Sequence, residues 1–395
     1  MNIDEAVVKK NTAPLWRLAF RAGFLGAGIF SVLAMLRWLI WVEDPARWTA
    51  EISPQWWHAH EMIFGFAMPV VAGFLLSAVA VWTGIAGTRG LRLKILFSAW
   101  LVARITLWLA PSAAMLAWAA EMLFIGLLMF ELGTRVWARR QWRNMLFLPV
   151  LLGLATLNTI SYTTADDLLL STRLHYSAVW LVTIMIVIVG GRVTPLFTAN
   201  RLGLKKWALP NWLEYSAIAS VALVAALLAI WPLAQINTPL QLLCLAGFCI
   251  HLYRMAHWQG WKTRSVALLW SMHLSYLCIP LALLGIGIVG NDPTAIKNIM
   301  HLLAIGSIGG MILAMMSRVS LGHTGRPIEL ARGVATAFAL IFIAALSRAL
   351  LPIIDPTLTH WSWRISALLW VIAFAIFVFR YYPVLTKARV DGKPG

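Results

Sequence analysis

The feature that most constrains this fold is a succession of apolar runs, each about 20 residues long, separated by short connectors. A helix of this length spans the hydrocarbon core of a bilayer. Backbone amides find no water there, so helices, which satisfy their own hydrogen bonds, are the expected structure. The composition agrees, because 61% of the 395 residues are hydrophobic and only 12% are charged. We therefore expect an all-α, polytopic membrane protein with a single integral membrane domain over residues 1–395.

The runs predict twelve transmembrane helices. These are expected near residues 15–42, 57–82, 92–109, 111–135, 143–161, 175–198, 212–232, 238–257, 265–289, 296–318, 330–351 and 362–385. Basic connectors, such as the one with Arg139 and Arg140, alternate with short or acidic ones, such as the one with Asp166. Since basic connectors stay in the cytoplasm, both termini are predicted to be cytoplasmic. The first run lacks a signal peptide's cleavage site and is expected to stay in the mature protein.

The net charge of +17 lies mainly in the basic connectors, where it sets membrane orientation, so no nucleic-acid partner is expected. The three cysteines, Cys244, Cys249 and Cys278, all lie in apolar runs and match neither a disulfide framework nor a zinc pattern. The chain has no C-x-x-C-H stretch, which attaches haem covalently. Any haem would therefore be held non-covalently.

Four histidines are predicted to share one depth on the outer side of the membrane. His58 and His60 lie at the outer mouth of the second predicted helix, His175 at the start of the sixth, and His301 about one turn into the tenth. Neutral imidazole is a usual ligand of iron, copper and zinc, so this set predicts a metal centre. The alternative for any single histidine is a hydrogen-bonded packing residue.

The stretch from His58 to Glu61 opens a run that is otherwise apolar. Residues two apart on a helix project about 200° apart, so His58 and His60 are expected to face two neighbouring sites. Glu61 is predicted on the His58 face, where it would orient an imidazole or carry protons. The alternative is that Glu61 caps the helix start. The part of the predicted helix that follows Glu61 has the flat apolar residues that suit a porphyrin: Phe64, Gly65, Phe66, Met68 and Gly73.

Four stretches together resemble the NnrS family: "HAHEMIFGFAMPVVAGFLLSAV", "HYSAVWLVTIMIVIVGGRVTPLFT", "LWSMHLSYLCIPLALLG" and "HLLAIGSIGGMILAMMSRVSLGHTGRP". The resemblance covers essentially the whole chain. It implies a multi-pass protein of the bacterial inner membrane, associated with haem and copper and with protection against nitric oxide in denitrifying and pathogenic bacteria. The residues that match the family are His58, His60, Glu61, His175, Arg192, His273, His301, Arg318 and His323. On this resemblance we expect one or two b-type haems, with copper or another non-haem metal as a further candidate.

The architecture is also similar to the twelve-helix catalytic subunit of haem-copper oxidases and nitric oxide reductases. In those proteins histidines from the corresponding helices hold two haems and a non-haem metal. Histidines begin the second, sixth and tenth predicted helices here as well. The chain departs from that pattern because it has no adjacent pair of histidines, which the oxidase copper site uses.

These observations lead to an expected oxidoreductase that reduces nitric oxide to nitrous oxide, with a quinol or a soluble protein as electron donor. The expected proton carriers, and so the catalytic residues, are Glu61 and Glu121, although Glu121 has the alternative of pairing with an arginine for packing. His58, His60, His175, His273 and His301 are the expected haem ligands, and His58, His60, His175 and His301 the expected metal ligands. Arg104, Arg348 and Arg37 are expected near haem propionates, and the alternative for Arg37 and Arg348 is that they snorkel toward the membrane surface. A carrier of a metal, haem or iron-nitrosyl species is the second hypothesis.

Overall fold

The computed structural model describes residues 12–205, 209–232, 237–290 and 292–393, and these residues form helices and no strand. The longer helices are α1 (Ala19–Glu43), α2 (Pro54–His60), α3 (Met68–Thr83), α4 (Leu91–Leu109), α5 (Ala114–Ala138), α7 (Phe147–Thr163), α8 (Leu168–Leu202), α9 (Asn211–Ile230), α10 (Asn237–Ala256), α11 (Ala267–Val289), α12 (Pro293–His301), α13 (Gly310–His323), α14 (Val334–Ile354) and α15 (Thr359–Thr386). Two π-helices, η3 (Glu61–Ala67) and η7 (Leu302–Gly309), join α2 to α3 and α12 to α13. Short turns of helix are η1 (Pro14–Trp16), η2 (Pro45–Arg47), η4 (Pro111–Ala113), α6 (Trp142–Met145), η6 (Gly260–Lys262) and η8 (Pro356–Leu358).

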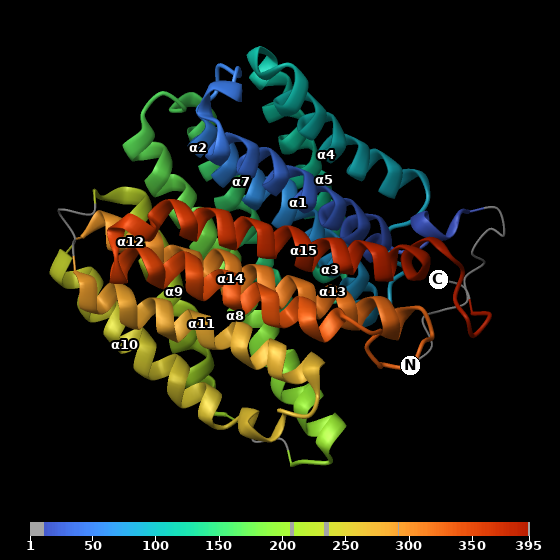
Figure 1. The fold of residues 1–395 in the computed structure, drawn as a ribbon. Coiled ribbons are helices and arrows are strands. Elements are labelled where there is room, and N and C mark those ends of the chain that lie inside the picture. Colours follow the sequence, from blue (N-terminus) through green and yellow to red (C-terminus); the bar gives the residue numbers. More distant parts are fainter. Residues whose placement is uncertain (1–11, 206–208, 233–236, 291, 394–395) are drawn as a thin grey trace.

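Eleven helical stretches in the described part of the chain are long and apolar enough to cross a membrane. This confirms the prediction of an all-α protein with many apolar helices, as expected of a multi-pass membrane protein. The predicted segment 92–109 forms helix α4 but is not among the eleven; it carries Arg92, Lys94 and Arg104. The first and last described residues lie at the same end of the bundle (Figure 1). The number of crossings, twelve, and the cytoplasmic termini stay predictions.

Two predicted helices are longer than their apolar runs. The segment predicted at 175–198 is α8, which begins at Leu168 because the Asp167 carboxylate accepts the Leu170 N–H at 3.0 Å. His175 therefore lies about two turns inside the helix, not at its start. At the other predicted segment, 296–318, helix continues to His323, which the run alone would place in a connector. Polar residues near the start of one helix and in the last turn of the other interrupt the apolar pattern, so the apolar run is shorter than the helix that contains it.

The two π-helices begin directly after His60 and His301. A π-helix bonds each N–H to the carbonyl five residues back, and such interruptions are frequent at functional sites. Pro69 has no N–H to give to the Gly65 carbonyl four residues earlier, and Trp100 Nε1–H donates to that oxygen instead, at 3.0 Å. The sequence thus interrupts the helix at a point where a neighbouring side chain replaces the lost bond.

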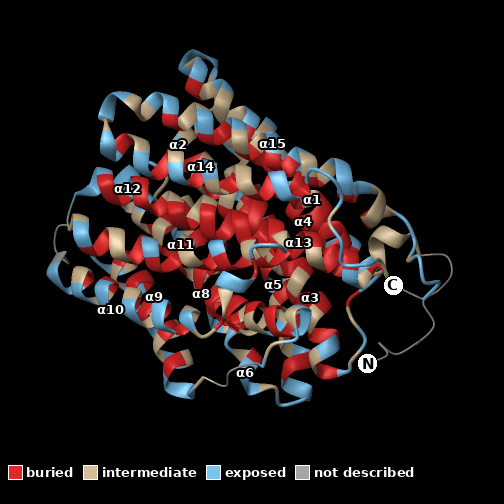
Figure 2. Ribbon diagram, turned by 60° about the horizontal axis from the view of Figure 1, so that its bottom comes forward, coloured by how far each residue is buried: buried red, intermediate tan, exposed pale blue. Residues whose placement is uncertain are grey.

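The helices pack side by side along one direction, with α1, α14 and α15 forming one layer (Figure 1). Buried residues gather along the middle of the bundle, while exposed residues lie at its periphery and its two ends (Figure 2). Helices α2, which carries His58 and His60, and α12, which carries His301, reach the same end of the bundle (Figure 1). This end is opposite to the one where the described chain begins and finishes.

Candidate functional site

A cavity of about 440 Å³ lies among α1, α2, η3, α8, α12, η7, α14 and α15. We call it the histidine cavity, because His58, His175 and His301 line it together. The rest of its wall is mainly apolar and aromatic, including Met35, Trp38, Trp41, Met62, Phe66, Tyr176, Met300, Ile305 and Trp370. Among the described residues that line it, none is acidic. Three imidazoles from three separate helices thus share one apolar space.

The three imidazoles differ in their hydrogen bonds. His301 Nδ1–H donates to the Lys297 carbonyl at 2.8 Å, so its Nε2 carries the free electron pair. His175 Nδ1 lies 3.4 Å from the Ser171 hydroxyl, and its Nε2 is buried with no hydrogen-bond partner among the described residues. A hydrogen bond at one ring nitrogen commonly orients the other toward a metal. Both His175 and His301 therefore have a nitrogen available for a ligand.

His58 is held differently, by stacking on an indole. Its ring lies 4.0 Å from that of Trp38 with an angle of 23° between the planes. Its Nδ1 is buried and has no hydrogen-bond partner in the part of the chain that the structure describes. An unpaired buried nitrogen is costly unless a ligand bonds to it. This geometry makes His58 a third candidate ligand in the histidine cavity.

One part of the cavity wall is cationic. The Arg348 guanidinium lies 5.7 Å and the Lys297 ammonium 5.9 Å from the ring of Trp363, so both cations flank one indole. Arg348 also donates to the Asn298 side-chain oxygen at 2.7 Å. Trp363 Nε1 is buried and finds no acceptor in the described chain. Two cations and an unused N–H donor form a suitable place for carboxylates.

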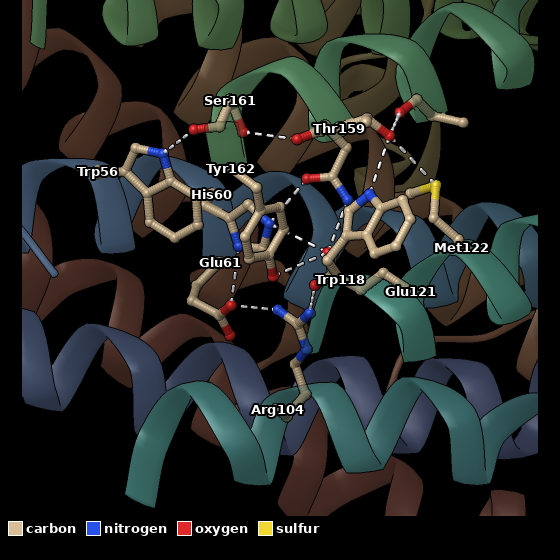
Figure 3. Close-up of polar contacts among 12 residues, drawn as sticks. Trp56, His60, Glu61, Arg104, Trp118, Glu121, Met122, Thr159, Ser161 and Tyr162 are labelled. Carbon is tan, nitrogen blue, oxygen red and sulfur yellow. Dashed lines mark hydrogen bonds and ion pairs between the residues drawn. The ribbon is translucent and has the colours of Figure 1, made fainter. Parts of the chain in front are cut away.

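A second group of polar side chains lies beside the cavity, and we call it the carboxylate cluster: His60, Glu61, Arg104, Glu121 and Tyr162 (Figure 3), together with Asn158, which bonds to His60 and Glu121. Arg104 forms ion pairs with both Glu61 and Glu121. Glu121 also accepts from Asn158 Nδ2 at 2.6 Å and from the Tyr162 hydroxyl at 3.2 Å. Glu61, Arg104 and Glu121 are each at most 3% exposed. One guanidinium thus faces two buried carboxylates.

His60 bonds within this cluster through both ring nitrogens. Nδ1 lies 3.1 Å from Glu61 Oε1, and Nε2 lies 2.9 Å from Asn158 Oδ1 and 3.3 Å from Glu121 Oε2. His58 and His60 therefore face two different groups of residues, His58 the cavity and His60 the cluster. Neither nitrogen of His60 is free for iron, so the structure does not favour His60 as a haem ligand.

Two expectations about the cluster were wrong. The Glu61 carboxylate does not meet His58: it contacts His60 and Arg104, because the Arg104 guanidinium of a neighbouring helix pairs with it. Arg104 does not reach the cavity either, since it is paired with the two carboxylates. Glu121 does pair with an arginine, as the packing alternative anticipated.

Trp56 forms the wall between the cluster and the cavity. Its ring lines the cavity and stacks on His60 at 4.5 Å with 9° between the planes. Trp56 Nε1–H donates to the Ser161 carbonyl at 3.1 Å, which fixes the indole (Figure 3). The two sites are therefore separated by a single layer of aromatic side chains.

His60, Glu61 and Glu121 place one ligand atom each within 4.8 Å of one another, a spacing that suits a metal ion. Carboxylates favour harder ions over copper(I), and Arg104 already supplies a cation between the two acids. These residues therefore fit copper(I) poorly. The expected metal set of His58, His60, His175 and His301 is divided, because His60 lies in the cluster and the other three line the cavity.

Several expected residues lie away from both sites. His273 Nε2 is 2.9 Å from the Thr198 hydroxyl and its ring packs near Trp258, because it lies only two turns from the start of α11, at the end of the bundle opposite the cavity. Arg37 is surrounded by the rings of Trp48, Trp57 and Trp108. Arg192 bonds to Asn144, Arg318 lies over the ring of Phe197, and the ring of His323 lies near that of Phe20. The structure therefore does not bring His273 or Arg37 to the cavity.

Four residues of the two sites were not predicted from the sequence: Asn158, Tyr162, Lys297 and Trp363. Asn158 had a usable signal, because an amide inside an apolar run needs a partner within the membrane. Lys297 also had one, since it precedes His301 by four residues and so lies on the same helix face. Tyr162 and Trp363 are at helix ends, where aromatic residues are common as interfacial anchors, and nothing in the sequence separates them from those.

The family described as NnrS protein matches residues 14–389, which is nearly the whole chain and confirms the resemblance found in the sequence. No curated protein matches the chain.

Proposed function

The chain belongs to the NnrS family, and from this premise we propose that it binds one b-type haem in the histidine cavity and reduces nitric oxide there to nitrous oxide. Membership of this family suggests a role in the response to nitric oxide. The observation that carries the proposal is the shared cavity of His58, His175 and His301, each with a ring nitrogen to which no described residue bonds. We place the protein in the bacterial inner membrane.

The residues of the cavity fit a haem in three respects. Imidazole nitrogens on separate helices supply axial ligands, and flat apolar walls such as Phe66, Met62 and Trp370 suit a porphyrin. Lys297, Arg348 and Trp363 supply donors for two propionates. Bound haem would supply an iron centre that carries single electrons and binds small gases.

The reaction joins two nitric oxide molecules, two electrons and two protons into one nitrous oxide and one water. The electrons come from a quinol or a soluble donor protein. The protons come from the carboxylate cluster, where Glu61 and Glu121 hold and release them. His60 contacts both carboxylates and stacks on Trp56, so it is the member of the cluster nearest the cavity wall. His60 therefore links the two carboxylates on the side of the cluster that faces the cavity wall.

A carrier function is the second candidate, and one observation favours it. The π-helices η3 and η7 interrupt two helices at their contact with the cavity, and transporters bind their substrates at such interruptions. In that case the cavity would take up and release haem or an iron-nitrosyl species. A protein that keeps stoichiometric haem through purification supports the enzyme, and one that exchanges it readily supports the carrier.

The test is an absorption spectrum of the purified protein together with an electrode measurement of nitric oxide in the presence of a reductant. We expect haem with imidazole ligation, and consumption of nitric oxide with formation of nitrous oxide. His301→Ala should alter or remove the haem. His257→Ala is the matched control, because His257 Nδ1 makes the same bond to a carbonyl four residues earlier, at 2.9 Å, but lies outside the cavity. Haem that is equally unaffected in both variants would contradict the proposal.

A further inference from the structure

A second pocket, of about 80 Å³ and partly open rather than enclosed, adjoins the histidine cavity, and we call it the apolar chamber. Val182 of α8 and Ile308 of η7 line both spaces and so form their common wall. The chamber lies where α1, α3, α7, α8, η7 and α13 meet. Its wall consists of Phe24, Val70, Val71, Phe74, Leu75, Phe147, Val182, Met185, Ile186, Val189, Gly190, Val193, Ile308, Met311, Ile312 and Met315.

None of these wall residues, all within the described chain, carries a charge or a hydrogen-bonding side chain. Water or an ion that entered would lose its hydrogen bonds without replacement, so polar ligands are disfavoured. Apolar cavities stay dry and bind apolar guests: one on the order of 150 Å³ takes up benzene or xenon. A chamber of about 80 Å³ suits a smaller guest. An uncharged diatomic gas has the required size and polarity.

We propose that the apolar chamber holds an uncharged diatomic gas and passes it to the histidine cavity between Val182 and Ile308. The two side chains are 2% and 5% exposed and come from different helices, so a small rotation of either one changes the width of the passage. That the gas is nitric oxide rests on the proposed function. The chamber itself depends only on its shape and its apolar wall.

The first test uses xenon, which binds apolar cavities whether or not haem is present. Crystals of the full-length protein are pressurised with xenon, and its position is found by anomalous scattering. We expect xenon beside Val70, Met185 and Met311. Met185→Trp and Val70→Phe should each fill the chamber and remove the signal. If crystals of the wild-type protein show no xenon at this position, the proposal that the apolar chamber holds a gas is wrong.

The second test measures the passage in haem-loaded protein, by recombination of carbon monoxide after flash photolysis. Val182→Phe should slow recombination by about tenfold, as a barrier higher by about 1.4 kcal/mol would, and Val182→Ala should accelerate it. Val224→Ala is the matched control, because Val224 is fully buried in α9 and lines neither space. If carbon monoxide recombines at the same rate in all variants, the proposed passage between Val182 and Ile308 is wrong. If the purified protein contains no haem, the proposed function fails, and xenon alone decides the chamber.

Discussion

The rings of His60 and His175 lie 6.4 Å apart, with 86° between their planes, across the boundary between the carboxylate cluster and the histidine cavity. His175 faces the cavity, while both nitrogens of His60 bond within the cluster. Trp56 contacts both rings, stacked on His60 and edge-on to His175 at 5.9 Å. The two rings therefore lie between the buried acids of the carboxylate cluster and the histidine cavity, which has no acid among its described lining residues.

His58→Ala and His60→Ala should give different spectra, although the two residues are only two positions apart. His58 lines the cavity, so its removal should change the spin state or the amount of bound haem. His60 bonds only to cluster residues through its ring nitrogens, so His60→Ala should keep the haem content. Absorption and electron paramagnetic resonance spectra of both variants make the comparison. Unchanged spectra in His58→Ala, or haem loss in His60→Ala, would contradict the assignment.

Arg104→Met should destabilise the protein strongly, because it leaves two buried carboxylates without their cation. Removing one partner of a buried ion pair typically costs about 3–5 kcal/mol. The double variant Arg104→Met with Glu121→Gln removes one of the two charges and should recover part of that loss. Thermal unfolding in detergent measures the effect.

Arg364→Met is the control for this experiment. Arg364 pairs with Glu43 at 2.6 Å, but their side chains are 31% and 47% exposed. Exposed pairs contribute about 0–1 kcal/mol, so the melting temperature should hardly change. Equal losses for Arg104→Met and Arg364→Met would show that the cluster is not an essential ion-pair network.

The number of crossings can be tested at helix α4. If α4 spans the membrane, a reporter inserted after Gly84 and one inserted after Ser112 should lie on opposite sides, the first in the cytoplasm. A reporter after Gly395 should be cytoplasmic and one near Asp166 external. Paired reporters that are active in opposite compartments, such as alkaline phosphatase and green fluorescent protein, measure this. Reporters at Gly84 and Ser112 on the same side would reduce the count to eleven.

The sequence predicts the helices and the division between His58 and His60, because both depend on local properties: the length of apolar runs and the rotation per residue. It does not predict the contacts of Glu61 correctly, since its ion-pair partner Arg104 comes from another helix. The hydrogen-bond partners of Glu121 could not be predicted from the sequence either. Asn158 and Tyr162 come from another helix, and a pattern along one helix does not determine which neighbour it packs against.

Glu61→Gln should keep its haem while losing most of its turnover with nitric oxide. The amide preserves the size of the side chain and its contact with His60, but it cannot carry the proton that the reaction consumes. Removal of a positioned proton carrier typically lowers the rate by about 10² to 10⁴. The measurement is nitric oxide consumption at an electrode, with nitrous oxide detected in parallel and haem content determined in the same sample. Glu43→Gln serves as the control, because Glu43 is the last residue of α1 and pairs with Arg364 outside the cluster. Full turnover in Glu61→Gln would remove Glu61 from the proton path, and haem-loaded wild-type protein that binds nitric oxide without consuming it would favour the carrier.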